Sequence, residues 1–144
     1  MIERFRQNLT IYFAEAAGLG AFMISACVFS VLIFHPDFAN AVIPAGARLP
    51  LMGTAMGLTA IAIFKSPVGS LSGGHINPAV TLTFWRLGKI GTADAAFYMI
   101  FQFIGSTCGV LVAWLATGTR LAHSMVNFAA TVPDISGTLI SFAA

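Results

Sequence analysis

Residues 70–86 read SLSGGHINPAVTLTFWR and interrupt an otherwise apolar, helix-like chain with a run rich in Ser, Gly and His. Directly after that run, Pro78 follows Asn77. Proline suits the first helical position, because the backbone N–H there has no partner within the helix, and asparagine is a favoured N-cap. The stretch therefore predicts irregular backbone from Ser72 to His75 and a new helix that starts at Pro78 with Asn77 as its cap.

The composition is that of a membrane protein. Of the 144 residues, 58% are hydrophobic and 8% are charged, and the mean hydropathy is +0.88. Ordinary globular domains carry about 25% charged residues. A net charge of +2 provides too little basic surface for a nucleic-acid-binding protein, so nucleic acid is excluded as a partner. We expect the lipid bilayer to surround this chain.

Several segments are apolar enough to cross a bilayer core of about 30 Å, which needs about 20 helical residues. We expect spans at about residues 9–34, 49–64 and 95–118. They form a single membrane domain over 1–144, in which Thr92 and Asp94 cap the third span. The helix that starts at Pro78 rises only about 13 Å and cannot cross. Residues 70–86 are therefore either a re-entrant loop and half-helix or a capped amphipathic helix at the cytoplasmic surface.

The basic residues are unevenly distributed around these spans. Those on the side of the N-terminus are Arg4, Arg6, Lys65, Arg86 and Lys89, and those on the other side are Arg48 and Arg120. Basic residues concentrate on the cytoplasmic side of membrane proteins. We therefore expect a multi-pass protein of the cell (inner) membrane with a cytoplasmic N-terminus. Residues 119–144 would then form an extracytoplasmic tail.

The residues around Asn77 favour contact with a neutral solute if the short helix is re-entrant. Irregular backbone at membrane depth needs protein or water to satisfy it, and Gly73 and Gly74 permit conformations that a side chain forbids. The N-terminus of a helix carries about half a positive charge. The Asn77 amide can donate two hydrogen bonds there. Such a site attracts a neutral solute with acceptor oxygens and does not attract a cation.

Several motifs resemble those of the aquaporin, or major intrinsic protein, family. SGGHINPAVT is similar to the family's loop and half-helix, and Asn77, Pro78 and Ala79 match its Asn-Pro-Ala triplet. AEAAG, which contains Glu15, and FQFIG, which contains Gln102, are similar to patterns in the family's first and third spans. The resemblance extends over about residues 9–115.

The resemblance implies an all-α membrane fold with three transmembrane helices and one re-entrant half-helix. These elements would be half of a right-handed inverted-repeat bundle, in which the two half-helices meet at mid-membrane. This chain resembles the first repeat only, because it has no second Asn-Pro-Ala and no counterpart of the arginine that follows it in the family. Its last residues, ISFAA, resemble the start of another span. We expect a second inverted repeat as a partner, either missing from this sequence or encoded as a separate chain. By resemblance we also expect a homo-oligomer, a tetramer.

We expect the pore and its selectivity to involve the loop, the start of the half-helix and one residue of the second span: Gly73, Gly74, His75, Asn77, Pro78, Ala79 and Met56. At His75 the backbone carbonyl is expected to matter more than the ring. No Cys, His or carboxylate cluster stands at metal-ligand spacing, so we expect no metal and no other cofactor. Met56 aligns with a position where water-selective family members typically carry a ring. A flexible thioether narrows a pore less firmly, which favours glycerol-like solutes.

Two buried polar side chains are expected to be structural. Glu15 would accept hydrogen bonds from the backbone of the re-entrant loop, because buried carboxylates need partners and the resemblance implies that role. Gln102 would bind helix and loop backbone. In the alternative, Glu15, His75 and Gln102 form a proton relay.

The sequence thus predicts a passive channel, or half of one, for water or small uncharged solutes such as glycerol. One alternative is a proton-coupled small-solute transporter, and another is a non-conducting membrane subunit. An enzyme is not expected, because no arrangement of nucleophile, base and orienting group can be assembled from Ser25, Ser30, Ser72 or His75.

Overall fold

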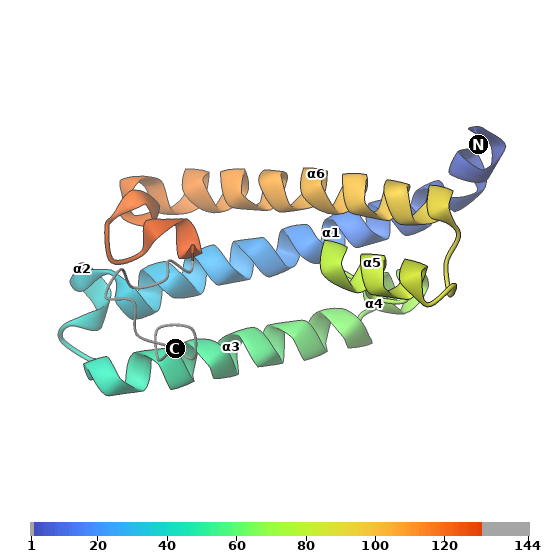
Figure 1. Ribbon diagram of the computed structural model, residues 1–144. Coiled ribbons are helices and arrows are strands. Elements are labelled where there is room, and N and C mark those ends of the chain that lie inside the picture. Colours follow the sequence, from blue (N-terminus) through green and yellow to red (C-terminus); the bar gives the residue numbers. More distant parts are fainter. Residues whose placement is uncertain (1, 131–144) are drawn as a thin grey trace, which may run out of the picture.

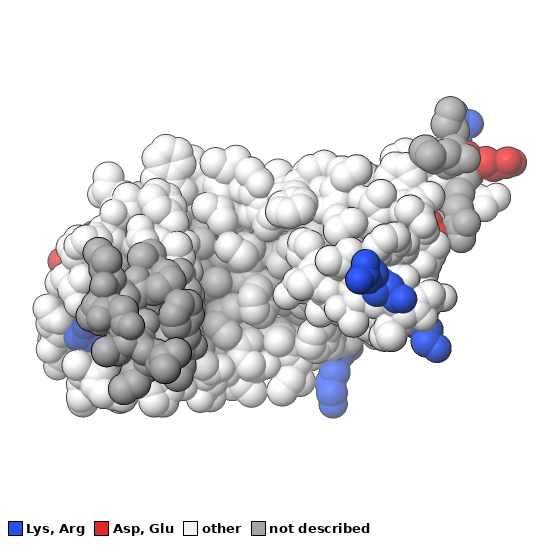
Figure 2. All heavy atoms as spheres, viewed as in Figure 1, with Lys and Arg blue, Asp and Glu red and all other residues white. Residues whose placement is uncertain are grey.

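Long helices run side by side in the computed structural model of the chain, which describes residues 2–130 without the side chains of Ile2 and Arg4 (Figure 1). They are α1 (Ile2–Phe34), α3 (Ala45–Lys65) and α6 (Thr92–Thr117). All three are long and apolar enough to cross a membrane. On the face shown in Figure 2, charged side chains gather toward the two ends of the bundle. The predicted all-helical fold with three long apolar helices is confirmed.

Short helices connect the long ones. They are α2 (Pro36–Ala39), α4 (Pro67–Ser72) and α5 (Pro78–Arg86), followed after α6 by the 3₁₀ turns η1 (Gly118–Ala122) and η2 (Asn127–Ala129). The α4 helix packs on α1 and α3, and α5 packs on α6. Figure 1 shows that α5 begins part-way along the long helices and ends at the end of the bundle where α6 begins. The nine residues of α5 therefore cover only part of the length of the bundle.

The α1 and α6 helices form the closest pair, because small residues let their backbones meet. A Cβ atom added at Gly105 would overlap the backbone of Ala16, and one added at Gly109 would overlap the backbone of Gly20. Close backbone approach of this kind is a main source of helix association in membranes, where apolar burial provides little driving force.

The α3 helix contacts α1 along one side only, and none of its residues is buried. A Cβ atom added at Gly53 or Gly57 would have no described neighbour within 4 Å. Among the described residues, the faces of α3 that touch neither α1 nor α4 are therefore open to lipid or to another protein surface.

A small hydrophobic cluster closes the end of the bundle opposite to α5. It consists of Cys27, Val31, Ala113, Leu121 and Val126. The predicted extracytoplasmic tail, 119–144, contributes to this cluster through its first part. Residues 131–144 lie outside the described residues, and so does the ISFAA segment that resembles the start of another span.

The sequence did not predict the short helix α4, whose start Ser66 caps by accepting a hydrogen bond from the Gly69 N–H at 3.2 Å. The predicted capping of α6 was wrong. The N-cap of α6 is Gly91, not Thr92 or Asp94. Asp94 instead accepts a hydrogen bond across the bundle from the Tyr12 hydroxyl at 2.7 Å. The short polar side chains could serve either role, and tertiary contacts decided which.

Candidate functional site

The candidate site begins at the N-terminus of α5. Asn77 has an extended backbone (φ −157°, ψ 125°), and its Oδ1 accepts a hydrogen bond from the Ala79 N–H at 2.8 Å. Pro78 occupies the first turn. The predicted Asn-Pro helix start is therefore confirmed. The Asn77 side chain is exposed, and its Nδ2 has no hydrogen-bond acceptor among the described residues.

The backbone before Asn77 turns sharply through left-handed conformations. Gly73 has φ 82° and Gly74 has φ 63°, values that glycine adopts without steric cost. Ile76 also has a positive φ of 36°, which is unusual for a β-branched residue and must be held by surrounding contacts. At the start of the turn, the Tyr98 hydroxyl donates a hydrogen bond to the Ser72 carbonyl at 2.9 Å.

Glu15 of α1 is the principal anchor of this turn. Its Oε1 accepts a hydrogen bond from the His75 N–H at 2.9 Å, and its Oε2 accepts one from the Ile76 N–H at 2.6 Å. Gln102 of α6 donates a third, from Nε2 to Oε2, at 2.7 Å. The Glu15 side chain is fully buried, and hydrogen bonds to a charged group compensate for part of the cost of its burial. The carboxylate thus ties the loop to two of the long helices.

A second set of contacts joins α5 to this anchor. The hydroxyl of Thr81, which is fully buried, lies 3.0 Å from Gln102 Nε2 and 3.1 Å from His75 Nδ1. The His75 ring lies against Phe84 of α5, with ring centroids 4.6 Å apart, and against Tyr98 of α6, with centroids 5.1 Å apart. The polar contacts form a closed circuit through α1, the loop, α5 and α6.

An open groove of about 550 Å³ lies beside the loop, between α1 and α3. Small side chains line it, among them Ala17, Ala21, Ser25, Thr59 and Ala62. Gly18, which also lines the groove, lets the loop approach α1, because a Cβ atom there would come within 2.6 Å of Ile76 Cγ2.

The comparisons with known proteins decide the family. The family model described as "Major intrinsic protein" matches residues 4–142. The chain belongs to the major intrinsic protein family.

Relatives within the family include a probable aquaporin TIP5-1 of Oryza sativa subsp. japonica, which is 32% identical over 132 residues, or 86% of this chain and 47% of that protein. Aquaporin Z of Photorhabdus laumondii is 34% identical over 94 residues, covering 65% and 38% of the two chains. An uncharacterized aquaporin-like protein of Haemophilus influenzae is 47% identical over 47 residues, covering 33% and 22%. This chain spans less than half the length of these relatives. No solved structure matches it.

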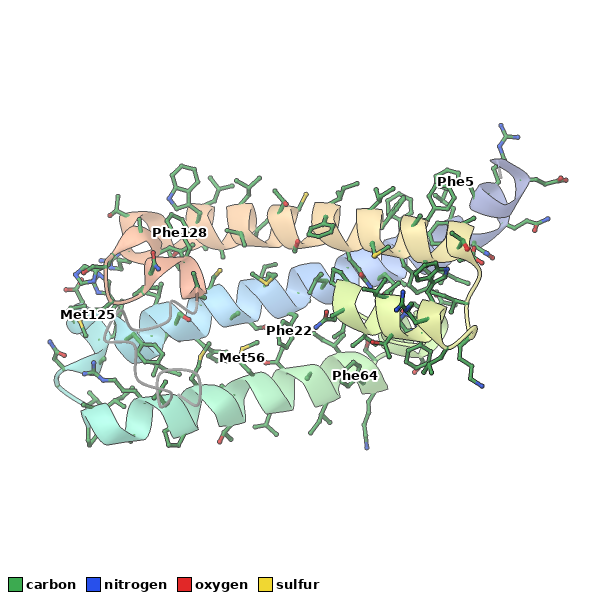
Figure 3. All side chains as sticks on the ribbon, viewed as in Figure 1. Phe5, Phe22, Met56, Phe64, Met125 and Phe128 are labelled. Atoms are coloured by element: carbon green, nitrogen blue, oxygen red, sulfur yellow. The ribbon has the colours of Figure 1, made fainter. Side chains whose placement is uncertain are left out.

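The structure brings together only some of the residues to which the family resemblance pointed. Glu15, His75 and Gln102 share one buried hydrogen-bond network. Asn77 lies next to this network in the chain but points out of it. Met56 is half-buried and separate from the network; Figure 3 shows it projecting from α3 toward α1.

The partners of Gln102 differ from those expected. The sequence predicts that its amide binds helix and loop backbone, whereas its Nε2 donates to two side chains, those of Glu15 and Thr81. Its Oε1 is buried and has no hydrogen-bond partner among the described residues.

Sequence reasoning missed Thr81 and Tyr98. A signal for Thr81 was present in NPAVT, because a residue four positions after the N-cap lies one turn further along the same helix face. Tyr98 likewise lies four residues before Gln102 on α6. Neither spacing identifies the hydrogen-bond partner of the side chain, because that partner lies on another element.

Proposed function

We propose that this chain supplies one half of a passive channel for water or small uncharged solutes, with Asn77 at its narrow centre. The observation that carries the proposal is the contrast, at the start of α5, between a firmly anchored backbone and an Asn77 amide group that donates no hydrogen bond to the described residues. The backbone around it is held by the fully buried Glu15, whereas Asn77 is exposed and its amide nitrogen has no acceptor among the described residues. A rigidly supported, unused donor at the positive end of a helix is suited to bind an oxygen of a passing neutral solute.

We further propose that α4, the turn and α5 form a re-entrant element. The nine residues of α5 rise about 13 Å, less than half of a bilayer core of about 30 Å. The position of α5, which begins part-way along the long helices and ends at the end of the bundle, supports this arrangement (Figure 1). The helix would then begin near the middle of the membrane and end at its cytoplasmic surface.

A second half of opposite orientation is the proposed partner. A re-entrant element that stops in mid-membrane leaves its peptide groups facing hydrocarbon unless protein or water covers them. Inverted repeats solve this problem in many transporters by placing two broken helices end to end. That half is either missing from this sequence or a separate chain, and the finished channels would assemble as tetramers, as the resemblance implies.

The proposed orientation places the N-terminus in the cytoplasm of a cell (inner) membrane. Basic residues support this direction, because Lys65, Arg86 and Lys89 lie at the same end of the chain's spans as the N-terminus. Identical copies inserted in both orientations are therefore not expected to complete each other.

The alternative of proton-coupled transport through Glu15 has less support. Both oxygens of this carboxylate accept hydrogen bonds, and the side chain has no exposed surface. A proton carrier needs an approach for the proton, so the contacts favour a structural carboxylate.

Met56→Phe is expected to shift selectivity toward water. A ring in place of a flexible thioether narrows a passage more firmly, and a water molecule is smaller than a polyol. The measurement is the ratio of water to glycerol permeability, by light scattering from liposomes that contain the chain together with the C-terminal half of Photorhabdus laumondii aquaporin Z. Met52→Phe, one helical turn earlier on α3, is the matched control. An unchanged ratio in Met56→Phe would remove this residue from the proposed filter.

A further inference from the structure

We propose that Thr81 is a positioning residue, whose hydroxyl accepts a hydrogen bond from Gln102 and donates one to His75 Nδ1. The His75 imidazole is thereby fixed as the neutral tautomer that carries its proton on Nε2. This inference deepens the proposed function, and its consequence for flux rests on that function, but its hydrogen-bond direction can be tested without any flux.

The direction follows from counting donors. Carboxylate oxygens only accept, so the group of Gln102 that faces Glu15 at 2.7 Å is the amide nitrogen. The other hydrogen of this nitrogen is directed to Thr81 Oγ1 at 3.0 Å. Thr81 is thus an acceptor toward Gln102, and its own single hydrogen remains available.

His75 Nδ1 is the acceptor for that hydrogen. It lies 3.1 Å from Thr81 Oγ1, and no other acceptor for this hydroxyl is present among the described residues. Thr83, on the same helix, shows the competing possibility, because its hydroxyl donates to the Ala79 carbonyl one turn earlier at 2.9 Å. Thr81 makes no such bond to its own helix. A buried hydroxyl without an acceptor is destabilising, which favours donation to His75.

This arrangement holds the start of α5 from both sides. The Thr81 N–H donates to the Asn77 carbonyl at 3.0 Å, while its hydroxyl holds the side chain of His75, two residues before Asn77. The His75 N–H is fixed by Glu15 at 2.9 Å. Thr81 therefore links the anchored loop to the helix turn that orients Asn77.

The test is the tautomer of His75, read from ¹⁵N chemical shifts of histidine-labelled full chain in lipid bilayers at pH 8. An unprotonated and a protonated ring nitrogen differ strongly in shift, and a His75→Gln variant assigns the signals. We expect unprotonated Nδ1 and protonated Nε2 in the unaltered chain. His35 and His123 are internal references for the shift of an unprotonated Nδ1. The Nδ1 of each accepts a hydrogen bond from a backbone N–H, that of Asp37 and Met125 respectively.

Two variants separate the hydroxyl from the shape of the side chain. Thr81→Ser keeps the hydroxyl and should keep the tautomer, whereas Thr81→Val keeps the shape and should give a mixture of both tautomers. A proton on Nδ1 in the unaltered chain would overturn the proposal, and that measurement does not depend on how the variants fold. An unchanged His75 spectrum in a folded Thr81→Val variant would overturn it as well. A changed tautomer without any effect on solute flux would support the hydrogen bond and count against the proposed channel function instead.

Discussion

Glu15→Gln is expected to detach the loop from α1 and to destabilise the fold more than any other single change in this network. The carboxylate accepts from two backbone N–H groups and from the Gln102 amide. A glutamine there presents one acceptor and one donor, so its –NH₂ group would face at least one of these donors. Hydrogen bonds to charged groups contribute about 1.5–3 kcal/mol each, and we expect a loss of about 3 kcal/mol in the free energy of unfolding.

Two measurements check this expectation: unfolding in mixed micelles, and hydrogen exchange at the amides of His75 and Ile76, which should lose protection. Glu3→Gln is the matched control, because it makes the same chemical change at an exposed position of the same helix. Stability equal to that of Glu3→Gln, with both amides still protected, would show that Glu15 does not anchor the loop.

Asn77→Asp is expected to reduce the flux of neutral solutes at least about tenfold without destabilising the fold. Aspartate caps helices about as well as asparagine, so the bond from the Ala79 N–H to the side-chain oxygen at position 77 is kept. The substitution removes two amide hydrogens and adds a negative charge at the positive end of the helix. Loss of one hydrogen bond of about 1.4 kcal/mol corresponds to a factor of ten.

The flux is measured as osmotic water permeability in liposomes that contain the chain and the second aquaporin half. Thr83→Val is the control on the same helix, because Thr83 is exposed and bonds only to its own helix among the described residues. If Asn77→Asp conducts as fast as Thr83→Val, the Asn77 amide does not face the solute, and the alternative of a surface helix gains support.

The long helices and the start of α5 could be predicted from the sequence because each depends on local rules. Length and apolar content identify a span, and the order Asn-Pro identifies a capped helix start. The observed bounds still differ, since α3 begins at Ala45 where the sequence suggested about residue 49. Pro50 lies inside α3, five residues after its first residue, so this proline does not mark the start of the helix.

The buried network could be predicted only in part. A carboxylate inside an apolar span must have partners, which singled out Glu15, and the family resemblance implied its contact with the loop. No local rule identifies Thr81 as the link between His75 and Gln102, because the residues lie on different elements and Gln102 is 87 positions from Glu15 and 21 from Thr81. Similarly, Ser66 and Asp94 could each cap a helix or bind elsewhere, and only the packing of α1, α3 and α6 decides.

The central claim, that this chain is one half of a channel, is tested most directly by osmotic swelling of three liposome preparations. They contain the purified chain alone, the C-terminal half of Photorhabdus laumondii aquaporin Z alone, and the two together. The account predicts that liposomes with either half alone swell at the rate of empty liposomes, because no second half covers the N-terminus of α5 at Asn77. Only liposomes that contain both halves should swell faster. Fast swelling with the chain alone, or an empty-liposome rate in all three preparations, would contradict it.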